Sequence, residues 1–378
     1  ITSDRFEIAA FLLAILLATQ TLAAWSSGRA WPLQLDAEEG FVLGQALTLA
    51  HGESIYQPLE YPHWLVGNYP PVFPWLWGRA QLLAIGPEAT PRSLPLGRTL
   101  AQGSAVLCAL LLGAIVWMRA RLIAPGLLAG LLFLGAWETA HWGSFARVDL
   151  PALALTLTGF GFFLLARRNS LLVASALALA AAGATRQTAV CAPLAALLAL
   201  LLNDRRRLGW FLVPYAGAGL LALGALQWAT GGQFWRHVVT YNMNKLDWNG
   251  WRAVMRHEIW FFYRWWLAAL AATALAAGVA WISQRKRLDG PDPENEALPP
   301  PADPPHARHA TAIYAALATL SLLNYAKIGA APNYALEPLA AWSLWGMEAL
   351  GRMLQAARSR PGAPFLAALG IALLYLVH

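Results

Sequence analysis

The sequence has few charged residues and almost no cysteine. Only 12% of its 378 residues are Asp, Glu, Lys or Arg, about half the share of an average soluble domain, whereas 58% are hydrophobic. This composition excludes an ordinary soluble domain and indicates a polytopic membrane protein. The two cysteines, Cys108 and Cys191, each lie inside an apolar run, where a thiol behaves as a small hydrophobic side chain. The sequence therefore predicts no disulfide framework.

Other missing patterns narrow the class of protein. The eight histidines show no ligand spacing such as His-x-x-x-His, so we expect no zinc site. No period of about 20–50 residues recurs, which argues against a solenoid and an obvious inverted repeat. The net charge of +7 would suggest nucleic-acid binding in a soluble chain. Here, however, the basic residues form short clusters between apolar runs, which is a membrane-topology signal, and we exclude nucleic acid as a partner.

Apolar runs predict an all-α, polytopic transmembrane bundle of about eleven spans. The predicted spans are 6–25, 98–118, 122–142, 150–166, 171–184, 188–202, 208–230, 259–282, 310–325, 334–347 and 365–378. Every strong Arg or Lys cluster then falls on one side of the membrane, and the positive-inside rule makes that side cytoplasmic. We treat 1–378 as one domain.

Three segments between the spans have distinct predicted roles. Residues 26–97 form the first outer loop, with amphipathic interfacial helices at 41–50 and 73–85, and residues 231–258 form the second outer loop. Residues 283–309 include a proline-rich, acidic stretch without aromatics and predict a flexible cytoplasmic loop. Many of the nineteen tryptophans lie in or beside the outer loops. Interfacial helices explain part of this bias, and contact with sugars or lipid chains is the alternative.

Three carboxylates lie together just after the first predicted span, in Asp36-Ala37-Glu38-Glu39-Gly40. Ionisable side chains beside hydrocarbon are costly and mark candidate functional sites. A structural explanation also exists, because Asp36 and Glu39 match a capping box and acids in a first turn suit the helix dipole. That explanation leaves Glu38 without a role, so both interpretations stay open.

Further charged residues are predicted to lie on the same outer side. Arg147 and Asp149 stand at the mouth of the fourth predicted span, where a capped helix with a local ion pair is as good an explanation as a functional role. Arg186 separates two apolar runs, so it either extends to the interface or holds an anion. Lys327 has a similar setting. Two cations from separate hairpins would thus converge on one anion.

The outer loops also hold side chains suited to a hydroxyl-rich ligand. Asn242 and Asn244 stand beside aromatic residues in the second outer loop, and such amides make paired hydrogen bonds to hydroxyl groups. An ordinary turn has a similar composition. In the first outer loop, the prolines and aromatics around Tyr69 predict a rigid wall.

In this order, the segments resemble the glycosyltransferase C (GT-C) superfamily, the polytopic enzymes that use polyprenyl-phosphate sugars, and within it the bacterial protein-mannosyltransferase-like branch (glycosyltransferase family 39-like). The resemblance covers most of the chain. The family usually shows an Asp-Glu pair after the first span, but here Glu38-Glu39 stands in that place and Asp36 precedes it, so any of the three matches the family's acid. The motifs that carry the resemblance are Asp36-Ala37-Glu38-Glu39-Gly40, Tyr69-Pro70-Pro71, Arg147-Val148-Asp149, Arg186-Gln187-Thr188, Asn242 with Asn244, and Lys327 with Asn333-Tyr334 and Glu337.

The resemblance implies an inverting membrane glycosyltransferase at the outer, periplasmic face of a bacterial inner membrane. Its donor would be a polyprenyl-phosphate sugar, and its acceptor a glycan, a lipid or a protein. A carboxylate would take the acceptor's proton while cations stabilise the departing phosphate. The implied residues are Asp36, Glu38 or Glu39 as the base, with Asp149 in the catalytic set; Arg147, Arg186 and Lys327 on the phosphate; and Tyr69, Asn242, Asn244, Asn333, Tyr334 and Glu337 on the substrate.

Two alternatives belong to other classes of protein. A transporter of lipid-linked substrates would use the same cations and aromatics without a base, although transporters typically show internal repeats. A non-catalytic scaffold subunit of a larger complex would not need clustered carboxylates. We expect no cofactor and no metal, although a carboxylate cluster is also able to bind a divalent ion.

Overall fold

Every regular element in the described part of the chain is a helix. The computed structural model describes residues 3–59, 65–259 and 303–358, and in these ranges the one β-type contact is an isolated antiparallel bridge between Leu246 and Lys327. The predicted all-α class is therefore confirmed.

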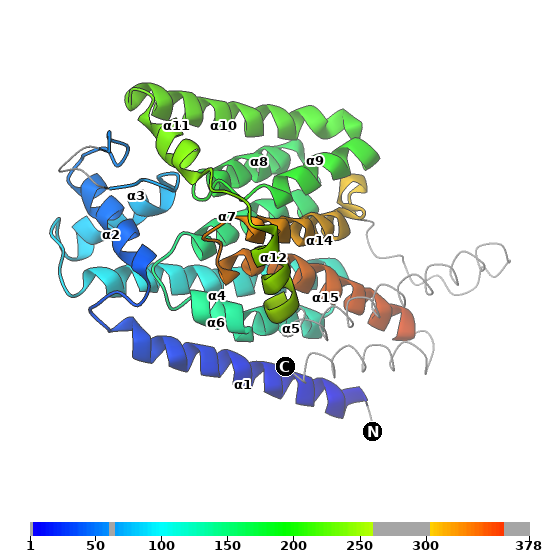
Figure 1. Cartoon of the computed structure of the whole chain (residues 1–378). Helices are drawn as coiled ribbons and strands as arrows, with labels where there is room; N and C mark the ends of the chain where they lie inside the picture. Colours follow the sequence, from blue (N-terminus) through cyan, green and yellow to red (C-terminus); the bar gives the residue numbers. More distant parts are fainter. Residues whose placement is uncertain (1–2, 60–64, 260–302, 359–378) are drawn as a thin grey trace.

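In the described part of the chain, nine helices run side by side along the length of the molecule (Figure 1). They are α1 (Ser3–Arg29), α4 (Ser93–Ala120), α5 (Ile123–Gly135), α7 (Asp149–Leu165), α8 (Asn169–Gly183), α9 (Cys191–Asn203), α10 (Leu208–Ala229), α14 (Ala310–Leu320) and α15 (Leu336–Arg358). Toward one end, at the left of Figure 1, lie α2 (Ala37–Ala50), α3 (Val72–Ala84) and α11 (Gln233–Val238). The shorter elements are α6 (Trp137–Trp142), η1 (Arg205–Arg207), η2 (Thr240–Asn242), α12 (Trp248–Val254), η3 (Met255–Ile259), η4 (Pro305–Ala307), η5 (Ser321–Ala326) and η6 (Pro332–Ala335).

Two helical stretches of the described chain are long and apolar enough to cross a membrane, Ser93–Ala120 and Arg205–Ala229. Four shorter helices, α5, α7, α8 and α9, are also apolar. The predicted span 365–378 and all but the first residue of 259–282 lie outside the described residues, as does most of the predicted loop 283–309. The count of about eleven spans therefore stays a prediction.

Several helix boundaries differ from those predicted. The first interfacial helix begins at Ala37 rather than at residue 41, because the Asp36 side chain accepts a hydrogen bond from the Glu38 backbone N–H and caps it. The predicted span 122–142 is interrupted at Ala136, which has an extended backbone between α5 and α6. The last turn of the predicted span 310–325 is a 3-10 helix, η5. These breaks lie where apolar composition continues, so hydrophobicity alone does not reveal them.

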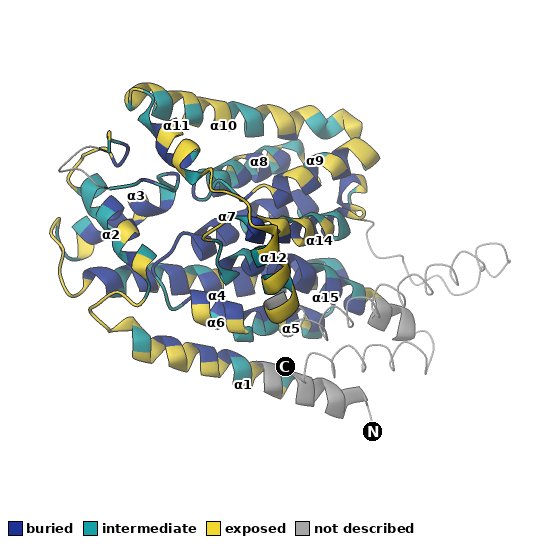
Figure 2. Ribbon diagram, in the orientation of Figure 1, coloured by how far each residue is buried: buried dark blue, intermediate teal, exposed yellow. Residues whose placement is uncertain are grey.

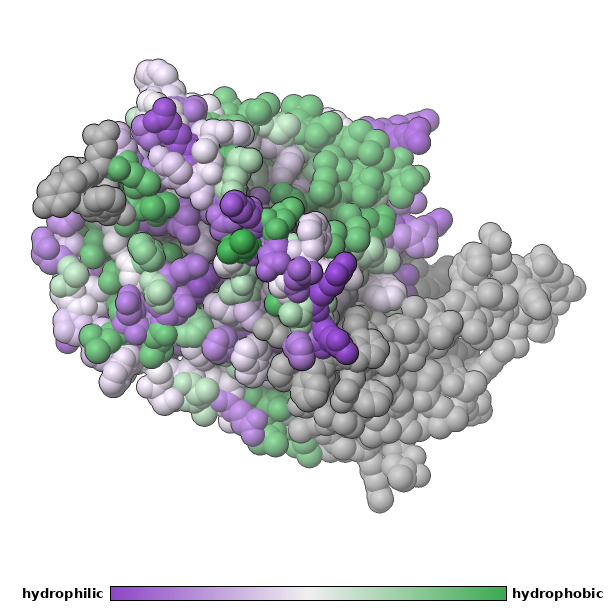
Figure 3. Space-filling model, viewed as in Figure 1, coloured by the Kyte–Doolittle hydropathy of each residue, from purple (hydrophilic) through white to green (hydrophobic). Residues whose placement is uncertain are grey.

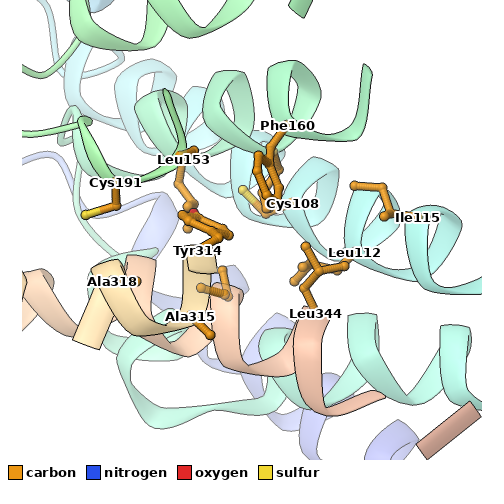
Figure 4. Close-up of a cluster of buried hydrophobic side chains, with 14 of the residues drawn as sticks. Cys108, Leu112, Ile115, Leu153, Phe160, Cys191, Tyr314, Ala315, Ala318 and Leu344 are labelled. Carbon is orange, nitrogen blue, oxygen red and sulfur yellow. The ribbon is translucent and has the colours of Figure 1, made fainter. Parts of the chain in front are cut away.

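The main core forms where α4, α7, α14 and α15 meet (Figure 4). Phe160 of α7 packs against Tyr314 of α14 with ring centroids 4.7 Å apart, and Leu112 and Leu344 are fully buried nearby. At the end of α4 away from α2, Arg119 donates two hydrogen bonds to Glu348 Oε1 at 3.0 and 2.7 Å. This buried ion pair fixes α4 to α15.

The outer surface of the bundle is strongly apolar along α10. Figure 2 shows α10 as mostly exposed or intermediate, and Phe211 is the buried residue of this helix. Figure 3 shows the corresponding hydrophobic surface over α9 and α10. A face of this kind suits contact with hydrocarbon rather than with water.

Helices α4 and α5 approach each other backbone to backbone. A Cβ atom on Gly126 of α5 would lie 2.7 Å from the Gly113 carbonyl oxygen of α4, and one on Gly130 would collide with the Ala109 carbonyl oxygen. Small residues at a helix interface permit such close packing in membranes.

We predict that Gly126→Ala destabilises the protein by about 1–3 kcal/mol, because the added methyl group forces the two helices apart. Gly103→Ala on α4 is the matched control, because a Cβ there meets no atom within 4 Å. That variant should unfold at the same temperature as the wild type or slightly higher. Thermal unfolding of the purified protein in detergent, followed by tryptophan fluorescence, compares the two. Equal melting temperatures for both variants would contradict the packing argument.

Candidate functional site

A buried ion pair between Glu39 and Arg98 fixes α2 against α4. Both side chains are fully buried, and the guanidinium contacts both carboxylate oxygens at 2.8 Å. The same carboxylate accepts backbone hydrogen bonds from Leu35 at 2.7 Å and Ala146 at 2.9 Å. Burial acts to raise the pKa of Glu39, but the hydrogen bonds from Arg98, Leu35 and Ala146 outweigh it, so this pKa lies below its ordinary value.

Arg98 also organises the chain between α1 and α2. Its guanidinium donates to the carbonyl oxygens of Gly28, Trp31 and Leu33, at 3.2, 2.6 and 2.7 Å. The sequence analysis missed this role, because an arginine at the first position of a predicted span is expected to extend into the interface. The signal in the sequence was the group of three carboxylates at residues 36–39, which requires cations beside it.

Arg147 holds the other two carboxylates of the cluster. Its Nη1 contacts Asp36 Oδ2 at 2.9 Å, its Nη2 contacts Glu38 Oε2 at 2.6 Å, and its Nε contacts Asp149 Oδ2 at 3.2 Å. The guanidinium also lies over the ring of Trp142, 5.0 Å from the centroid. Every nitrogen of this guanidinium therefore faces a carboxylate. The side chains of Asp36 and Glu38 remain 28% and 36% exposed, in contrast to that of Glu39.

Asp149 joins the two predicted arginines. Its Oδ1 contacts Arg186 Nη1 at 3.0 Å and accepts a 2.7 Å hydrogen bond from Asn333 Nδ2. Only 2% of the Asp149 side chain is exposed, compared with 12% for Arg186. The Arg186 guanidinium lies over the ring of Tyr334, 4.9 Å from the centroid. The loops that precede α7, α9 and α15 thus meet at one point.

Tyr69 brings the first outer loop onto the carboxylates. Its hydroxyl donates to Glu38 Oε2 at 2.7 Å, and its backbone carbonyl accepts from the Tyr56 hydroxyl at 2.8 Å. Burial and the nearby Glu38 charge raise the pKa of Tyr69 well above its ordinary value. Tyr69 is therefore a stable hydrogen-bond donor to Glu38 at neutral pH.

The second outer loop delivers the two predicted asparagines, and Lys327 lies beside them directly after η5. Lys327 Nζ lies 3.5 Å from Asn242 Oδ1, and Asn242 Nδ2 donates to the carbonyl oxygen of Asn68 at 2.8 Å. Asn244 Nδ2 donates to the carbonyl oxygen of Ile328 at 2.9 Å. The amide donors of both asparagines thus bind main chain of segments that are distant in sequence. Burial and Arg186 lower the pKa of Lys327 while Glu38 raises it, with a net lowering.

A buried histidine links the two outer loops. His237 is fully buried in α11. Its Nδ1 accepts from the Gly67 N–H at 2.9 Å, and its Nε2 lies 2.7 Å from the Gln57 carbonyl oxygen. A neutral imidazole protonated at Nε2 satisfies both contacts. The sequence analysis assigned this histidine no role, and a single histidine beside aromatics gave no signal for one.

Most of the predicted site residues therefore converge at one end of the bundle. A connected set of contacts joins Asp36, Glu38, Tyr69, Arg147, Asp149, Arg186, Asn333 and Tyr334. Glu337 lies one helical turn further along and accepts a 3.3 Å hydrogen bond from the Tyr314 hydroxyl. Among the described residues, no three His, Cys, Asp or Glu side chains are arranged to hold a metal ion. Metal dependence stays a prediction.

No protein-family model and no curated protein matches this sequence, but solved structures do. The chain is similar to ArnT from Cupriavidus metallidurans bound to undecaprenyl phosphate, with a TM-score of 0.57 and 15% identity over 91% of this chain. It spans 63% of that ArnT chain. Apo ArnT gives a TM-score of 0.56 at 14% identity, covering 97% of this chain and 76% of ArnT. The Archaeoglobus fulgidus oligosaccharyltransferase, in complex with Zn and sulfate, gives 0.51 at 12% identity, covering 97% and 53%.

These similarities establish the fold. The chain shares the helical fold of ArnT and of the archaeal oligosaccharyltransferase, in agreement with the polytopic helical fold that the resemblance implied.

We predict that Arg98→Leu lowers the free energy of unfolding by about 3–5 kcal/mol, because it leaves a buried carboxylate without its cation. The double variant Arg98→Leu with Glu39→Leu should recover part of this loss.

Since the pKa of Glu39 in the folded protein is below its ordinary value of 4.5, its contribution to stability is complete above that pH and is lost as the pH falls through the folded-state pKa. Glu39→Gln should reduce this acid-induced loss. Melting temperatures across pH 3–7 test both statements. An unchanged melting temperature for Arg98→Leu would contradict the first, and an equal acid-induced loss in Glu39→Gln and the wild type would contradict the second.

Proposed function

We propose that this protein is a membrane glycosyltransferase that transfers a sugar from a polyprenyl-phosphate donor to an acceptor at the outer face of a bacterial inner membrane. The observation that carries the proposal is the convergence of three carboxylates and three cations, from separate segments, at one end of a GT-C fold. Such a donor presents a lipid tail, a phosphate and a sugar. The apolar bundle suits the lipid tail, the cations suit the phosphate, and the partly exposed carboxylates suit the reaction at the sugar.

The geometry narrows the choice of general base. Glu39 is fully buried and accepts hydrogen bonds from Arg98, Leu35 and Ala146, so an acceptor has no access to it. Asp36 and Glu38 are partly exposed, and each is held through one oxygen only, Oδ2 and Oε2 respectively, by the contacts described. We place the base at Asp36 or Glu38 and assign Glu39 a structural role.

The contacts of the three predicted cations also change which of them we assign to the phosphate. All three nitrogens of the Arg147 guanidinium already face carboxylates, so we assign Arg147 the task of positioning Asp36 and Glu38. Arg186 uses Nη1 on Asp149, which leaves its other donors for a ligand. Lys327 has its long contact to Asn242. We therefore propose that Arg186 and Lys327 hold the phosphate through charge-assisted hydrogen bonds, and that the buried Asp149 positions the two arginines.

The reaction then follows from these positions. The base takes the proton of the acceptor hydroxyl or amine while the acceptor atom bonds to the anomeric carbon. The bond between that carbon and the phosphate oxygen breaks, and the polyprenyl phosphate leaves with the electron pair. Arg186 and Lys327 stabilise the charge that gathers on the phosphate. A phosphate leaving group needs no general acid, and a single displacement inverts the anomeric configuration.

We predict that the variant of the true base, Asp36→Asn or Glu38→Gln, lowers turnover by about 10²–10⁴-fold with little change in stability. Glu88→Gln is the matched control, because Glu88 is an acid near the same end with 81% of its side chain exposed. The assay incubates the protein in lipid with a panel of polyprenyl-phosphate sugars and acceptors and follows polyprenyl-phosphate release by mass spectrometry. Donor binding without release by the wild type under all acceptors would favour the transporter or scaffold alternatives, and full activity in both variants would exclude a carboxylate base here.

We predict that Lys327→Met weakens donor binding about tenfold or more, because a charged hydrogen bond to the phosphate is lost. Lys245→Met is the matched control, since Lys245 is an exposed cation on the segment that pairs with Lys327 through main-chain bonds. Binding of a polyprenyl-phosphate sugar, measured in nanodiscs, separates the two. Equal losses in both variants would point to general electrostatic attraction instead of a phosphate ligand.

A further inference from the structure

An apolar groove on the exposed side of α4 and α5 lies apart from the site described above. Its volume is about 450 Å³, within the range of small-ligand pockets. It is lined by two matched helical stripes, from Val106 to Trp117 on α4 and from Ile123 to Leu134 on α5. The described residues that line it are all apolar. Arg98, in the first turns of α4, and the carboxylates that surround it lie at the opposite, N-terminal end of this helix.

The shape of the groove follows from residue size along the two stripes. Its floor is the close contact of small residues described above, where Gly113 of α4 meets Gly126 of α5. Its walls are large side chains that stand away from the contact, such as Leu110 at 65% exposed and Leu127 at 44% exposed. A narrow trough with a flat floor and tall apolar walls fits one hydrocarbon chain better than a helix or a ring.

The length of the groove indicates which kind of hydrocarbon chain it fits. From Val106 to Trp117 the helix rises about 16 Å, roughly half of the 30 Å hydrocarbon core of a bilayer. This is the depth of one leaflet, which is the span of a phospholipid acyl chain. A polyprenyl chain is several times longer and would overrun both ends.

The end of the groove near Trp117 and Ile123 supplies the matching charge. Arg121 lies between these residues in sequence, is exposed, and has no side-chain acceptor among the described residues. Trp117 and Ile123 are 51% and 63% exposed beside it. An amphipathic indole together with a cation is typical of the level of lipid headgroups.

We propose that this groove binds one anionic phospholipid from the leaflet on the Arg121 side, with an acyl chain in the trough and the headgroup phosphate at Arg121. The proposal does not depend on the transferase activity. Its location on the α4–α5 contact gives the bound lipid a role in holding these two helices in the orientation that carries Arg98.

Native mass spectrometry of the full chain in detergent, titrated with phosphatidylglycerol, tests the proposal. The wild type should retain one phosphatidylglycerol. Ala114→Trp, which fills the trough, should abolish this binding. Ala222→Trp is the matched control, because Ala222 lies on the exposed apolar face of α10 and the change is the same; it should retain the lipid. Leu110→Gln, at a 65% exposed wall position, is the second variant in case Ala114→Trp misfolds, and it should also weaken retention.

The headgroup contact has its own pair of variants. Arg121→Gln should weaken binding about fivefold, whereas Arg92→Gln, an exposed arginine at the other end of α4, should not. Retention of phosphatidylglycerol by Ala114→Trp and Leu110→Gln would overturn the proposal. So would displacement of a bound polyprenyl phosphate, rather than a phospholipid, by Ala114→Trp. If the wild type instead forms a dimer without bound lipid, and Ala114→Trp abolishes that dimer, the groove belongs to a second copy of the chain.

Discussion

The fixed position of α2 depends on the buried contact between Glu39 and Arg98. Removing two full charges from water is costly, and this cost is offset only when the pair is bidentate and its remaining polar atoms are satisfied. Here both conditions hold, because backbone N–H groups complete the carboxylate and three carbonyl oxygens complete the guanidinium. The contacts come from the ends of α1, α4 and α6. One ion pair thus sets the orientation of the helix whose first turn carries Asp36 and Glu38.

The site itself is an almost neutral arrangement of charges at the edge of an apolar bundle. Arg147 and Arg186 both contact Asp149, and Arg147 also contacts Asp36 and Glu38. In a medium of low polarity such a network restricts each side chain to one geometry, because any unpaired charge is costly. In the contacts described, Arg186 and Lys327 keep donors for a ligand, and Asp36 and Glu38 each keep one oxygen. The proposed function uses these two sets of groups for an anion and for a base.

The outer loops act mainly as structural supports of this network. Asn242, His237 and Tyr56 each bind main chain of the first outer loop, and Tyr69 then reaches Glu38. Polar side chains that the sequence makes attractive as sugar ligands are therefore partly committed to holding loops together. Buried main-chain groups without regular secondary structure must be satisfied in this way.

The sequence by itself determined the all-α class and the set of motifs that resemble the GT-C superfamily, and it predicted an outer location for both polar loops. These depend on composition and order along the chain, which are local properties. The resemblance also placed Asp149 and Arg186 in one site, whereas the direct contact between them came from the structure. Only the tertiary structure decided which carboxylate is committed to the fold. Asp36, Glu38 and Glu39 are alike in sequence, but α2 presents Glu39 to Arg98, which is 59 residues distant, and such a pairing is set by how helices pack rather than by any pattern in the chain.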